Sequence, residues 1–465
     1  MYQAWKPLPE GIGQQFPLRP AGEVTLLTDI TYLDAAGIRH SDQQVFDEAL
    51  RLIGQANRLI VVDMFLFNDF TGTDAATPLR PLSAQLTHAL VKRKRAVPGL
   101  QVLLITDPIN TLYGGVPSKH LDALRAAGIE VVVTDLARLR APNPAWSGFW
   151  HLCCRWAGNN QDGGWLQSPF GPGKVTLRSY LALLNLNANH RKTLVVDAGD
   201  GWAGWVASAN PHDGSSAHGN VALQFDGAAA LDLLRSERAV VAMSGVRWPL
   251  AVAGLQRELE SEPAPVAGTS GARVQILTEG RIRDALLANV TQAKSGDHLD
   301  IAVFYFSHRA LLKALVAAQQ RGVQVRVLLD PNEDAFGRKK NGIPNRQAAL
   351  EMHQAEVPVR WCDTHGEQCH AKLMLRRSAD GNSELIAGSA NYTRRNLDDY
   401  NLESSARILA ASDAPVMRQA TDYFEQNWNN GDGRQVSLPY PAYADTSRLR
   451  YWQYRLAEAS GLSSF

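Results

Sequence analysis

Apolar and amphipathic segments alternate along this chain, and the same order of segments occurs twice. Each copy begins with a short apolar strand, continues with a helical pattern and reaches a strongly apolar strand. The matching segments are 24–29 and 274–279, 46–56 and 282–293, and 59–67 and 299–306. Near-continuous apolar strands between amphipathic helices indicate buried, largely parallel strands in an α/β layer.

A further pair of strands extends the match. The strand 102–106 is followed by Asp107-Pro108, and the strand 325–329 is followed by Asp330-Pro331. Asp-Pro after a strand is typical of turns, so these residues are interpreted as turn residues. The repeat covers roughly 20–245 and 272–430. Because an isologous contact brings equivalent positions together, two such halves predict a pseudo-twofold arrangement with the site at their interface.

The length of 465 residues fits two domains of about 200 residues each. A Pro/Gly/Ser-rich linker at 261–271 separates them. The expected organisation is a first half at 1–260, this linker, a second half at 272–432 and a C-terminal tail at 433–465.

The two halves share a polar motif as well as an apolar pattern. The first copy comprises His190, Lys192 and Asp197, then Ser208 and Asn210; the second comprises His370 and Lys372, then Ser389 and Asn391. Each His-x-Lys is predicted to open a strand, and each Ser-x-Asn to follow the next strand. A single His-x-Lys would mean little, but two in matched contexts form a strong signal.

Two imidazoles with two ammonium groups and two amides are suited to phosphodiester chemistry without a metal or other cofactor. A neutral imidazole can attack phosphorus, and a protonated one can supply the leaving alkoxide with a proton. A reference pKa near 6.5 makes opposite protonation states accessible at physiological pH. Lys192, Lys372, Asn210 and Asn391 would stabilise the non-bridging oxygens.

The motifs resemble the phospholipase D superfamily, whose signature is H-x-K-x4-D followed by G/S-x-N. The segments 189–197 and 388–396, with Asn401-Leu-Glu403, look like the bacterial cardiolipin synthase branch. The resemblance implies two phospholipase D-like α-β-α repeats with the active site between them. It also implies that His190 is the nucleophile and His370 the acid/base, although the reverse assignment remains open.

The resemblance extends to residues around the histidines. A downstream carboxylate or amide orients each imidazole in the family, which implies Glu403 for His370, and Gln224 or Asn220 for His190. It further implies that Ser208, Ser389 and Arg394 contact the substrate, with Arg394 near a phosphate-bearing head group.

Two positions depart from the family pattern. Arg377 stands where the second copy's Asp is expected, and Ala222 stands where the second half has Glu403. A degenerate member that binds anionic lipid without turnover is therefore an alternative to an enzyme.

The first half contains about 43 extra residues, near 138–180. They include four of the chain's eleven Trp, and the aromatic residues there are Trp146, Phe149, Trp150, Trp156, Trp165 and Phe170. They form either a small satellite core or a lipid-contacting flap beside the site. The basic and aromatic segment 448–455 is either a short interfacial helix or a helix docked on the second half.

Composition narrows the choice of partner. A net charge of +1 argues against an overall electrostatic grip on nucleic acid. The chain contains no run of 18 apolar residues, so a membrane-spanning helix is not expected. Its first residues do not resemble a signal peptide. The four cysteines do not indicate a disulfide framework, which suits a cytoplasmic protein, possibly peripheral on the inner membrane. Cys362, His365 and Cys369 give a minor alternative of zinc ligands.

The sequence therefore predicts a phospholipase D-like phosphodiesterase or phosphatidyltransferase acting on glycerophospholipids at a membrane surface. The alternatives are a nuclease or other phosphodiesterase, and the degenerate lipid binder. The sequence leaves open the head group, the choice of water or alcohol as acceptor, and the oligomeric state.

Overall fold

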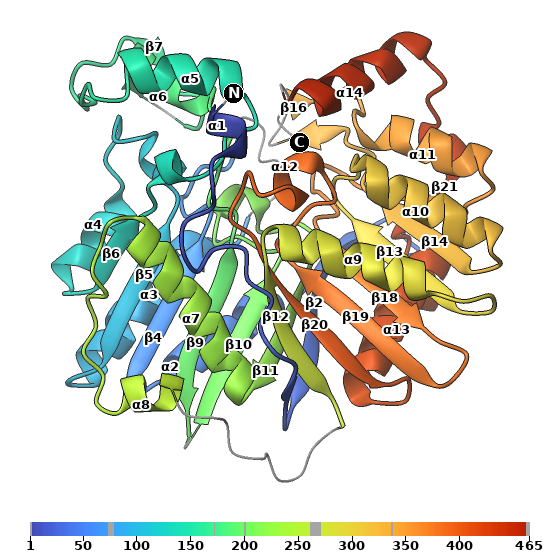
Figure 1. The fold of residues 1–465 in the computed structure, drawn as a ribbon, viewed down its shortest axis with the longest axis horizontal. Coiled ribbons are helices and arrows are strands. Elements are labelled where there is room, and N and C mark those ends of the chain that lie inside the picture. Colours follow the sequence, from blue (N-terminus) through green and yellow to red (C-terminus); the bar gives the residue numbers. More distant parts are fainter. Residues whose placement is uncertain are drawn as a thin grey trace.

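The computed structural model describes residues 2–72, 79–171, 173–199, 201–260, 271–335 and 338–461. Most of the predicted linker, 261–270, lies outside these residues. The chain forms two large sheets that lie side by side, each flanked by helices on its outer face (Figure 1).

Within the described residues the first sheet has eight strands in the order β3-β2-β11-β10-β9-β4-β5-β6. Their bounds are β2 Val24–Leu33, β3 Arg39–Gln43, β4 Leu59–Met64, β5 Gln101–Thr106, β6 Glu130–Val133, β9 Lys192–Ala198, β10 Gly201–Ala207 and β11 Asn220–Asp226. The helices of this half are α2 Val45–Gln55, α3 Leu82–Ala96, α4 Lys119–Ala126, α7 Ala228–Met243 and α8 Leu255–Glu260.

The second sheet has nine described strands in the order β1-β12-β20-β19-β18-β13-β14-β17-β21. Their bounds are β1 Arg19–Pro20, β12 Arg273–Thr278, β13 His298–Val303, β14 Gln324–Leu329, β17 Val359–Cys362, β18 Lys372–Arg377, β19 Asn382–Gly388, β20 Ser404–Ala411 and β21 Ser437–Pro439. The helices of this half are α9 Gly280–Gln292, α10 Arg309–Gln320, α11 Asn345–Gln354, α12 Arg394–Leu397, α13 Pro415–Asn429 and α14 Arg448–Ser460. A small hairpin joins β15 Asp334–Ala335 and β16 Arg338–Lys339.

The predicted repeat is visible in the strand order. The series β2-β11-β10-β9-β4-β5-β6 in the first sheet matches β12-β20-β19-β18-β13-β14-β17 in the second. Among the described strands of the two sheets, only β4–β5, β5–β6, β13–β14 and β14–β17 pair in parallel. The expectation of largely parallel strands is wrong for the others, because β9–β10 and β18–β19 are joined by short turns that permit only antiparallel pairing. The α/β fold class is confirmed.

The burial of β4 explains its continuous apolar run. Leu59 and Val61 face a core between the two sheets, whereas Ile60 and Val62 face a second core beneath the outer helices. Both faces are covered, so every residue of the strand is buried. The second half has an equivalent outer core beneath α9, α10 and α11.

The core between the sheets joins the halves into one body. It contains residues of both sheets together with α7 and α13. Helix α7 contacts β10 of its own half and β12 of the other, and α13 contacts β19 of its own half and β2 of the other. Each half therefore contributes a helix to the partner sheet, which fixes the relative position of the two motifs.

Two strands cross the domain boundaries that the sequence predicts. The N-terminal β1 pairs with β12, and β21 of the tail pairs with β17, so both ends of the chain add to the second sheet. A short helix, α1 (Tyr2–Trp5), precedes β1. The exact boundaries stay a prediction.

The insertion of the first half forms a separate layer above the sheet (Figure 1). It contains α5 (Pro144–Cys153), β7 (Leu166–Gln167), β8 (Lys174–Val175) and α6 (Leu177–Leu183). Trp150 is buried there, but Phe149, Trp156 and Trp165 are exposed. A satellite core therefore accounts for only part of the aromatic content.

The cysteines depart from the sequence-based expectation. Cys153 is bonded to Cys154, and Cys362 to Cys369. The expectation of no disulfides is wrong, because adjacency at 153–154 and the return of the loop after β17 bring the sulfurs together. The cytoplasmic location stays a prediction. None of the helices among the described residues is long and apolar enough to span a membrane.

Candidate functional site

Both His-x-Lys motifs open a strand, as predicted, and both face one cavity. Lys192 is the first residue of β9 and Lys372 the first of β18. His190, His370, Asn210 and Asn391 all line a cavity of 340 Å³ at the junction of the two halves. The predicted convergence of the two motifs is therefore seen in the geometry.

Backbone hydrogen bonds dock each motif on the other half. His190 N donates to the Leu402 carbonyl at 2.9 Å, and Leu402 N donates to the Ala188 carbonyl at 3.0 Å. In the second copy, His370 N donates to the Gly219 carbonyl at 2.7 Å, and Gly219 N donates to Gln368 at 2.9 Å. Each histidine thus lies on a strand-like segment whose partner belongs to the opposite repeat.

The side chains that orient the histidines also come from the opposite half. His190 Nδ1 lies 3.0 Å from Glu403 Oε1, and His370 Nδ1 lies 3.2 Å from Asn220 Oδ1. The expectation that Glu403 orients His370 is wrong, as is the assignment of Asn220 or Gln224 to His190. The sequence places each partner downstream of its own motif, but the pseudo-twofold contact exchanges them.

Ser208 and Ser389 act on these partners and lie outside the cavity lining. Ser208 Oγ donates to Asn220 Oδ1 at 3.0 Å and accepts from Val221 N. Ser389 Oγ donates to Glu403 Oε2 and accepts from Ser404 N. Both serines are fully buried, and substrate contact by either one stays a prediction. They fix the amide and the carboxylate.

The arginine at the cavity is Arg395 rather than the predicted Arg394. Arg394 directs its guanidinium to the carbonyls at the end of α14 and, at 3.0 Å, to the Tyr400 hydroxyl. These contacts hold Arg394 against α14, and its contact with the substrate stays a prediction. Arg395 lines the cavity.

Asp197 lies at the far end of β9 from Lys192. Its carboxylate accepts hydrogen bonds from the backbone amides of residues 57–59 at 2.8–3.2 Å, where β4 begins. The motif places Asp197 among the predicted catalytic residues, but five positions of extended strand, about 16 Å, separate it from Lys192; a direct role in catalysis stays a prediction. It anchors β9 to the start of β4.

Arg377 occupies the equivalent end of β18. Its guanidinium lies 2.8 Å from Asp300 and 3.6 Å from Glu425, and it does not line the cavity. The departure from the motif therefore replaces one structural contact with another, at a distance from the histidines.

Two phenylalanines that the sequence reasoning missed flank the histidines symmetrically. The Phe65 ring lies 4.9 Å from His190 and 5.1 Å from Lys192 Nζ. The Phe304 ring lies 4.9 Å from His370 and 5.3 Å from Lys372 Nζ. Their matching positions just after β4 and β13 were the available signal.

The two Asp-Pro turns support the motifs directly. Asp107 accepts a hydrogen bond from Asn189 N at 2.7 Å, and Asp330 accepts one from Cys369 N at 2.8 Å. Each carboxylate also caps its own turn, as the sequence predicts. Burial raises the pKa of Asp107 to about 7 and that of Asp330 to about 6. The turns therefore position the residue that precedes each histidine.

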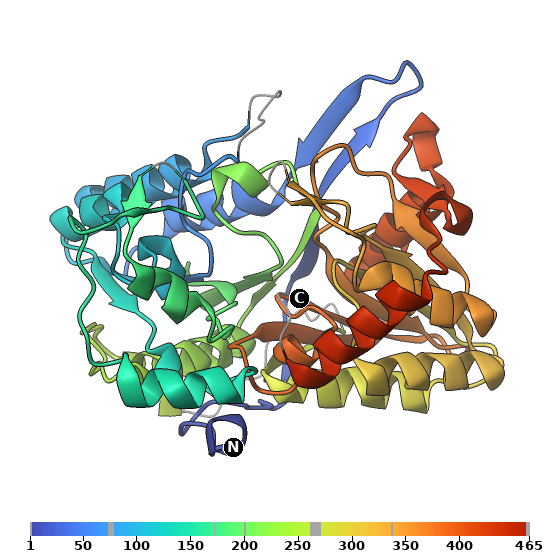
Figure 2. The same cartoon turned by 90° about the horizontal axis from the view of Figure 1, so that it is seen from above.

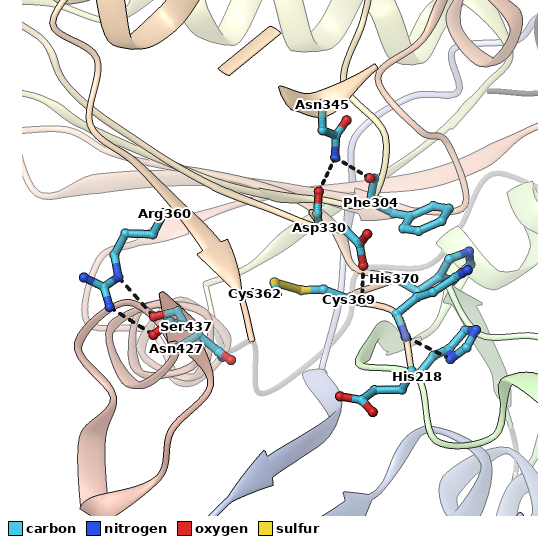
Figure 3. The surroundings of a disulfide bond; sticks show 12 residues. His218, Phe304, Asp330, Asn345, Arg360, Cys362, Cys369, His370, Asn427 and Ser437 are labelled. Carbon is cyan, nitrogen blue, oxygen red and sulfur yellow. Dashed lines mark hydrogen bonds between the residues drawn. A yellow bond between two sulfur atoms is a disulfide. The ribbon is translucent and has the colours of Figure 1, made fainter. Parts of the chain in front are cut away.

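The loop before His370 is closed by the Cys362–Cys369 disulfide (Figure 3). His218, from the other half, accepts from Gln368 N at 3.2 Å and lies with its ring centroid 6.0 Å from that of His370. His218 also lines the cavity. Within the described ranges, no group of three or more potential ligands is arranged to hold a metal ion, so the zinc reading of Cys362 and Cys369 is wrong.

Burial and positive charge dominate the electrostatics. Burial lowers the pKa of His190 to about 4 despite the carboxylate of Glu403, and lowers that of Lys192 to about 7. Burial and the neighbouring Lys372 hold the pKa of His370 well below its usual range. An anion in the cavity would favour the protonated forms of these groups. The site is therefore suited to binding a negatively charged group.

The cavity walls differ in character. The histidines, the asparagines and Arg395 form a polar part. The remaining wall includes Phe170, Leu183 and Leu186 of the insertion, together with Leu66 and Ile109. The cavity can hold an anionic group beside an apolar one.

Comparisons with known proteins match this geometry. Residues 286–428 match the family model described as "Cardiolipin synthase, PLD-like domain". Mouse mitochondrial cardiolipin hydrolase is 25% identical over 206 residues, covering 42% of this chain and 85% of that protein. The resemblance to the phospholipase D superfamily is confirmed.

Solved structures extend the likeness to the whole fold. Phosphatidylserine synthase of Haemophilus influenzae Rd KW20 superimposes with a TM-score of 0.57 at 12% identity, covering 96% of each chain. Polyphosphate kinase of Porphyromonas gingivalis gives 0.47 at 12% identity and covers 95% of this chain. This chain spans about half of that kinase, 53% of its length. At such identities the likeness concerns the fold alone.

Proposed function

We propose that this protein cleaves or transfers phosphodiesters of glycerophospholipids through a phosphohistidine intermediate. The observation that carries the proposal is the pair of buried imidazoles in one cavity, each held by an acceptor from the opposite half. The match to a cardiolipin synthase domain and the similarity to a cardiolipin hydrolase support a phospholipid substrate.

The two acceptors assign different roles to the histidines. Glu403 is anionic and stabilises positive charge on His190, as required when its other nitrogen bonds to phosphorus. Asn220 offers His370 a neutral oxygen, so His370 releases its proton more readily. His190 is the nucleophile in this proposal, and His370 is the general acid and then the general base.

The steps balance with these residues alone. His190 Nε2 attacks phosphorus, and the bond to the leaving alkoxide breaks as His370 gives it a proton. His370 then takes a proton from water or an alcohol, whose oxygen displaces His190 from phosphorus. Lys192, Lys372, Asn210 and Asn391 stabilise the non-bridging oxygens, and the entering phosphodiester raises the pKa of His370 enough for it to carry the proton.

Two observations bear on the alternatives. The apolar wall of Phe170, Leu183 and Leu186 favours an acyl-bearing substrate over a nucleic acid. Arg377, the main reason to consider a degenerate lipid binder, contacts Asp300 rather than the cavity. Both observations favour the lipid enzyme.

Product analysis tests the proposal. Purified protein is incubated separately with phosphatidylglycerol, phosphatidylethanolamine and a short oligonucleotide, and products are identified by mass. Phosphatidic acid indicates hydrolysis, and cardiolipin from phosphatidylglycerol indicates transfer. Oligonucleotide cleavage without lipid turnover would replace the proposal with the nuclease, and no product from any substrate would favour the binder.

A further inference from the structure

Two helices from different halves carry exposed apolar stripes. On α5, Phe149 and Leu152 are exposed, and Trp156 follows just beyond the helix end. On α14, Leu449, Trp452 and Leu456 are exposed. The spacing places Phe149 and Leu152 on one face of α5, and Leu449, Trp452 and Leu456 on one face of α14.

The opposite face of each helix is the one that packs on the protein. Trp150 of α5 and Tyr454 of α14 are buried, and they lie roughly across the helix from the exposed stripes. Ser307 and the Arg394 amide both hydrogen-bond to Glu458, which also lies on the buried face of α14. The apolar side chains of the exposed stripes therefore do not belong to the core that each helix packs against. Leu152 is 85% exposed, Trp156 76% and Trp452 62%.

The two helices lie at the same end of the molecule and approach each other. Figure 1 shows α5 and α14 above the two sheets, α5 over the first half and α14 over the second, and Figure 2 shows them from above. Gly461, which ends α14, lies so close to Pro142 just before α5 that an added Cβ would be 2.1 Å from the Pro142 carbonyl oxygen. Helix α1 contacts α5 and adds the exposed Trp5.

The same end contains the cavity. Phe170 of the insertion both lines the cavity and is partly exposed. Ala457 of α14 packs against Phe304 and Tyr305, which form part of the cavity wall. The apolar stripes therefore border the route by which an acyl-bearing substrate would arrive.

The charged residues beside the α14 stripe indicate what kind of partner binds this surface. Arg448 and Arg455 lie on one side of the α14 stripe, whereas Arg450, on the other side, is paired with Asp445 at 2.7 Å. An apolar stripe that contains Trp and is bordered by arginines is the pattern of a helix lying at the interface of an anionic bilayer.

We propose that α5 and α14, with Trp5 beside α5, form a two-part surface that docks on an anionic lipid bilayer and presents the cavity to it. The inference extends the proposed function by naming how the same site meets its substrate. Both helices insert their apolar stripes at the level of the head groups, and Arg448 and Arg455 of α14 contact lipid phosphates.

Vesicle binding tests the surface on the full chain. Co-sedimentation is measured with vesicles of phosphatidylcholine alone and with vesicles containing phosphatidylglycerol. We expect binding to the anionic vesicles that weakens with added NaCl. Leu152→Ser with Trp156→Ser, and Trp452→Ser with Leu456→Ser, should each lower the partition coefficient about tenfold or more. Arg448→Gln should weaken binding to anionic vesicles only.

Ile38→Ser is the matched control. Ile38 is 58% exposed at the tip between β2 and β3, a hairpin that projects on the side away from α14 (Figure 2). Its replacement should leave vesicle binding unchanged. Equal loss in this variant, unchanged binding in both double variants, or no binding by the unaltered protein would overturn the proposal. A double variant that binds vesicles normally but has a lower molar mass in light scattering would also overturn the proposal, because the surface would then bind a second copy of the protein.

A soluble diester separates this proposal from the catalytic one. The double variants should turn over bis(4-nitrophenyl) phosphate like the unaltered protein but lose turnover of phosphatidylglycerol in vesicles. The unaltered protein and the variants could all fail to turn over both substrates while vesicle binding follows the pattern above. That result would support the docking surface and contradict the proposed catalysis.

Discussion

At the scale of residues, the difference between Glu403 and Asn220 is the main chemical asymmetry of the site. Each accepts from, or pairs with, the Nδ1 of a histidine in the other half, but only one is anionic. Sequence reasoning found both histidines, both lysines and both asparagines because their spacing is local. It assigned the acceptors to the wrong histidines because their pairing depends on how the halves meet.

Replacing either histidine should abolish turnover, but the chemical reason differs between the two. His190→Ala removes the atom that bonds to phosphorus, whereas His370→Ala removes the proton donor and should lower kcat by roughly 10²–10⁴. A rapid denaturing quench at alkaline pH during turnover of labelled lipid should trap the labelled phosphatidyl group on His190 in the unaltered protein. Label on His370 would reverse the roles, and full activity of either variant would exclude the two-histidine mechanism.

Chelation with EDTA should leave the rate of turnover unchanged, because the proposed steps use only side chains of the protein. Strong inhibition by the chelator would instead indicate a metal-dependent reaction.

Changing Asn220 to Asp should move the pH profile. A carboxylate beside His370 favours imidazolium and so raises its pKa. Because the acid must be protonated for leaving-group departure, the alkaline limb of kcat/KM should shift upward by about one unit or more. Ser208→Ala, which removes the hydrogen bond to Asn220 without adding charge, serves as a control. An unchanged alkaline limb in Asn220→Asp would contradict the assignment of His370 as the acid.

At the scale of elements, the repeat and the strands that open at Lys192 and Lys372 followed from periodicity. The antiparallel hairpins and the positions of the insertion and α14 did not, because they depend on turn length and on long-range docking. Ser208 and Ser389 illustrate the limit: their motif spacing marks them as important, but only the fold shows that they contact Asn220 and Glu403 rather than the cavity.

The disulfide loop before His370 should matter for stability and for activity. Cys362→Ser opens a loop of about eight residues, and the loss of chain restriction should lower the free energy of unfolding by about 2 kcal/mol. Asp330 and His218 hold the same loop through backbone amides, so part of the His370 geometry should persist and kcat should fall only severalfold. Denaturant unfolding and steady-state kinetics with and without reductant measure both effects. Equal stability of oxidised and reduced protein would argue against the bond.

At the scale of the whole molecule, a buried ionic contact next to the site joins the two halves. Arg191, between His190 and Lys192, lies 2.8 Å from Glu279 of the second half and 3.5 Å from Glu237 of its own. All three side chains are fully buried. Glu279 also accepts hydrogen bonds from Gly13 N at 2.7 Å and Glu403 N at 3.1 Å. The contact thus links the first motif, the N-terminal segment and the residue that orients His190.

Removing one partner of this contact should be more harmful than removing two. Arg191→Met leaves two buried carboxylates without their cation, and we expect a loss of about 3–5 kcal/mol in the free energy of unfolding. Arg191→Met combined with Glu279→Gln leaves one carboxylate fewer and keeps one amide oxygen that can accept from either Gly13 N or Glu403 N, so part of the loss should be recovered. Denaturant unfolding of the single and double variants measures the difference. A single variant as stable as the unaltered protein would show that this contact does not hold the halves together, and the alignment of the two histidines would then depend on the shared apolar core alone.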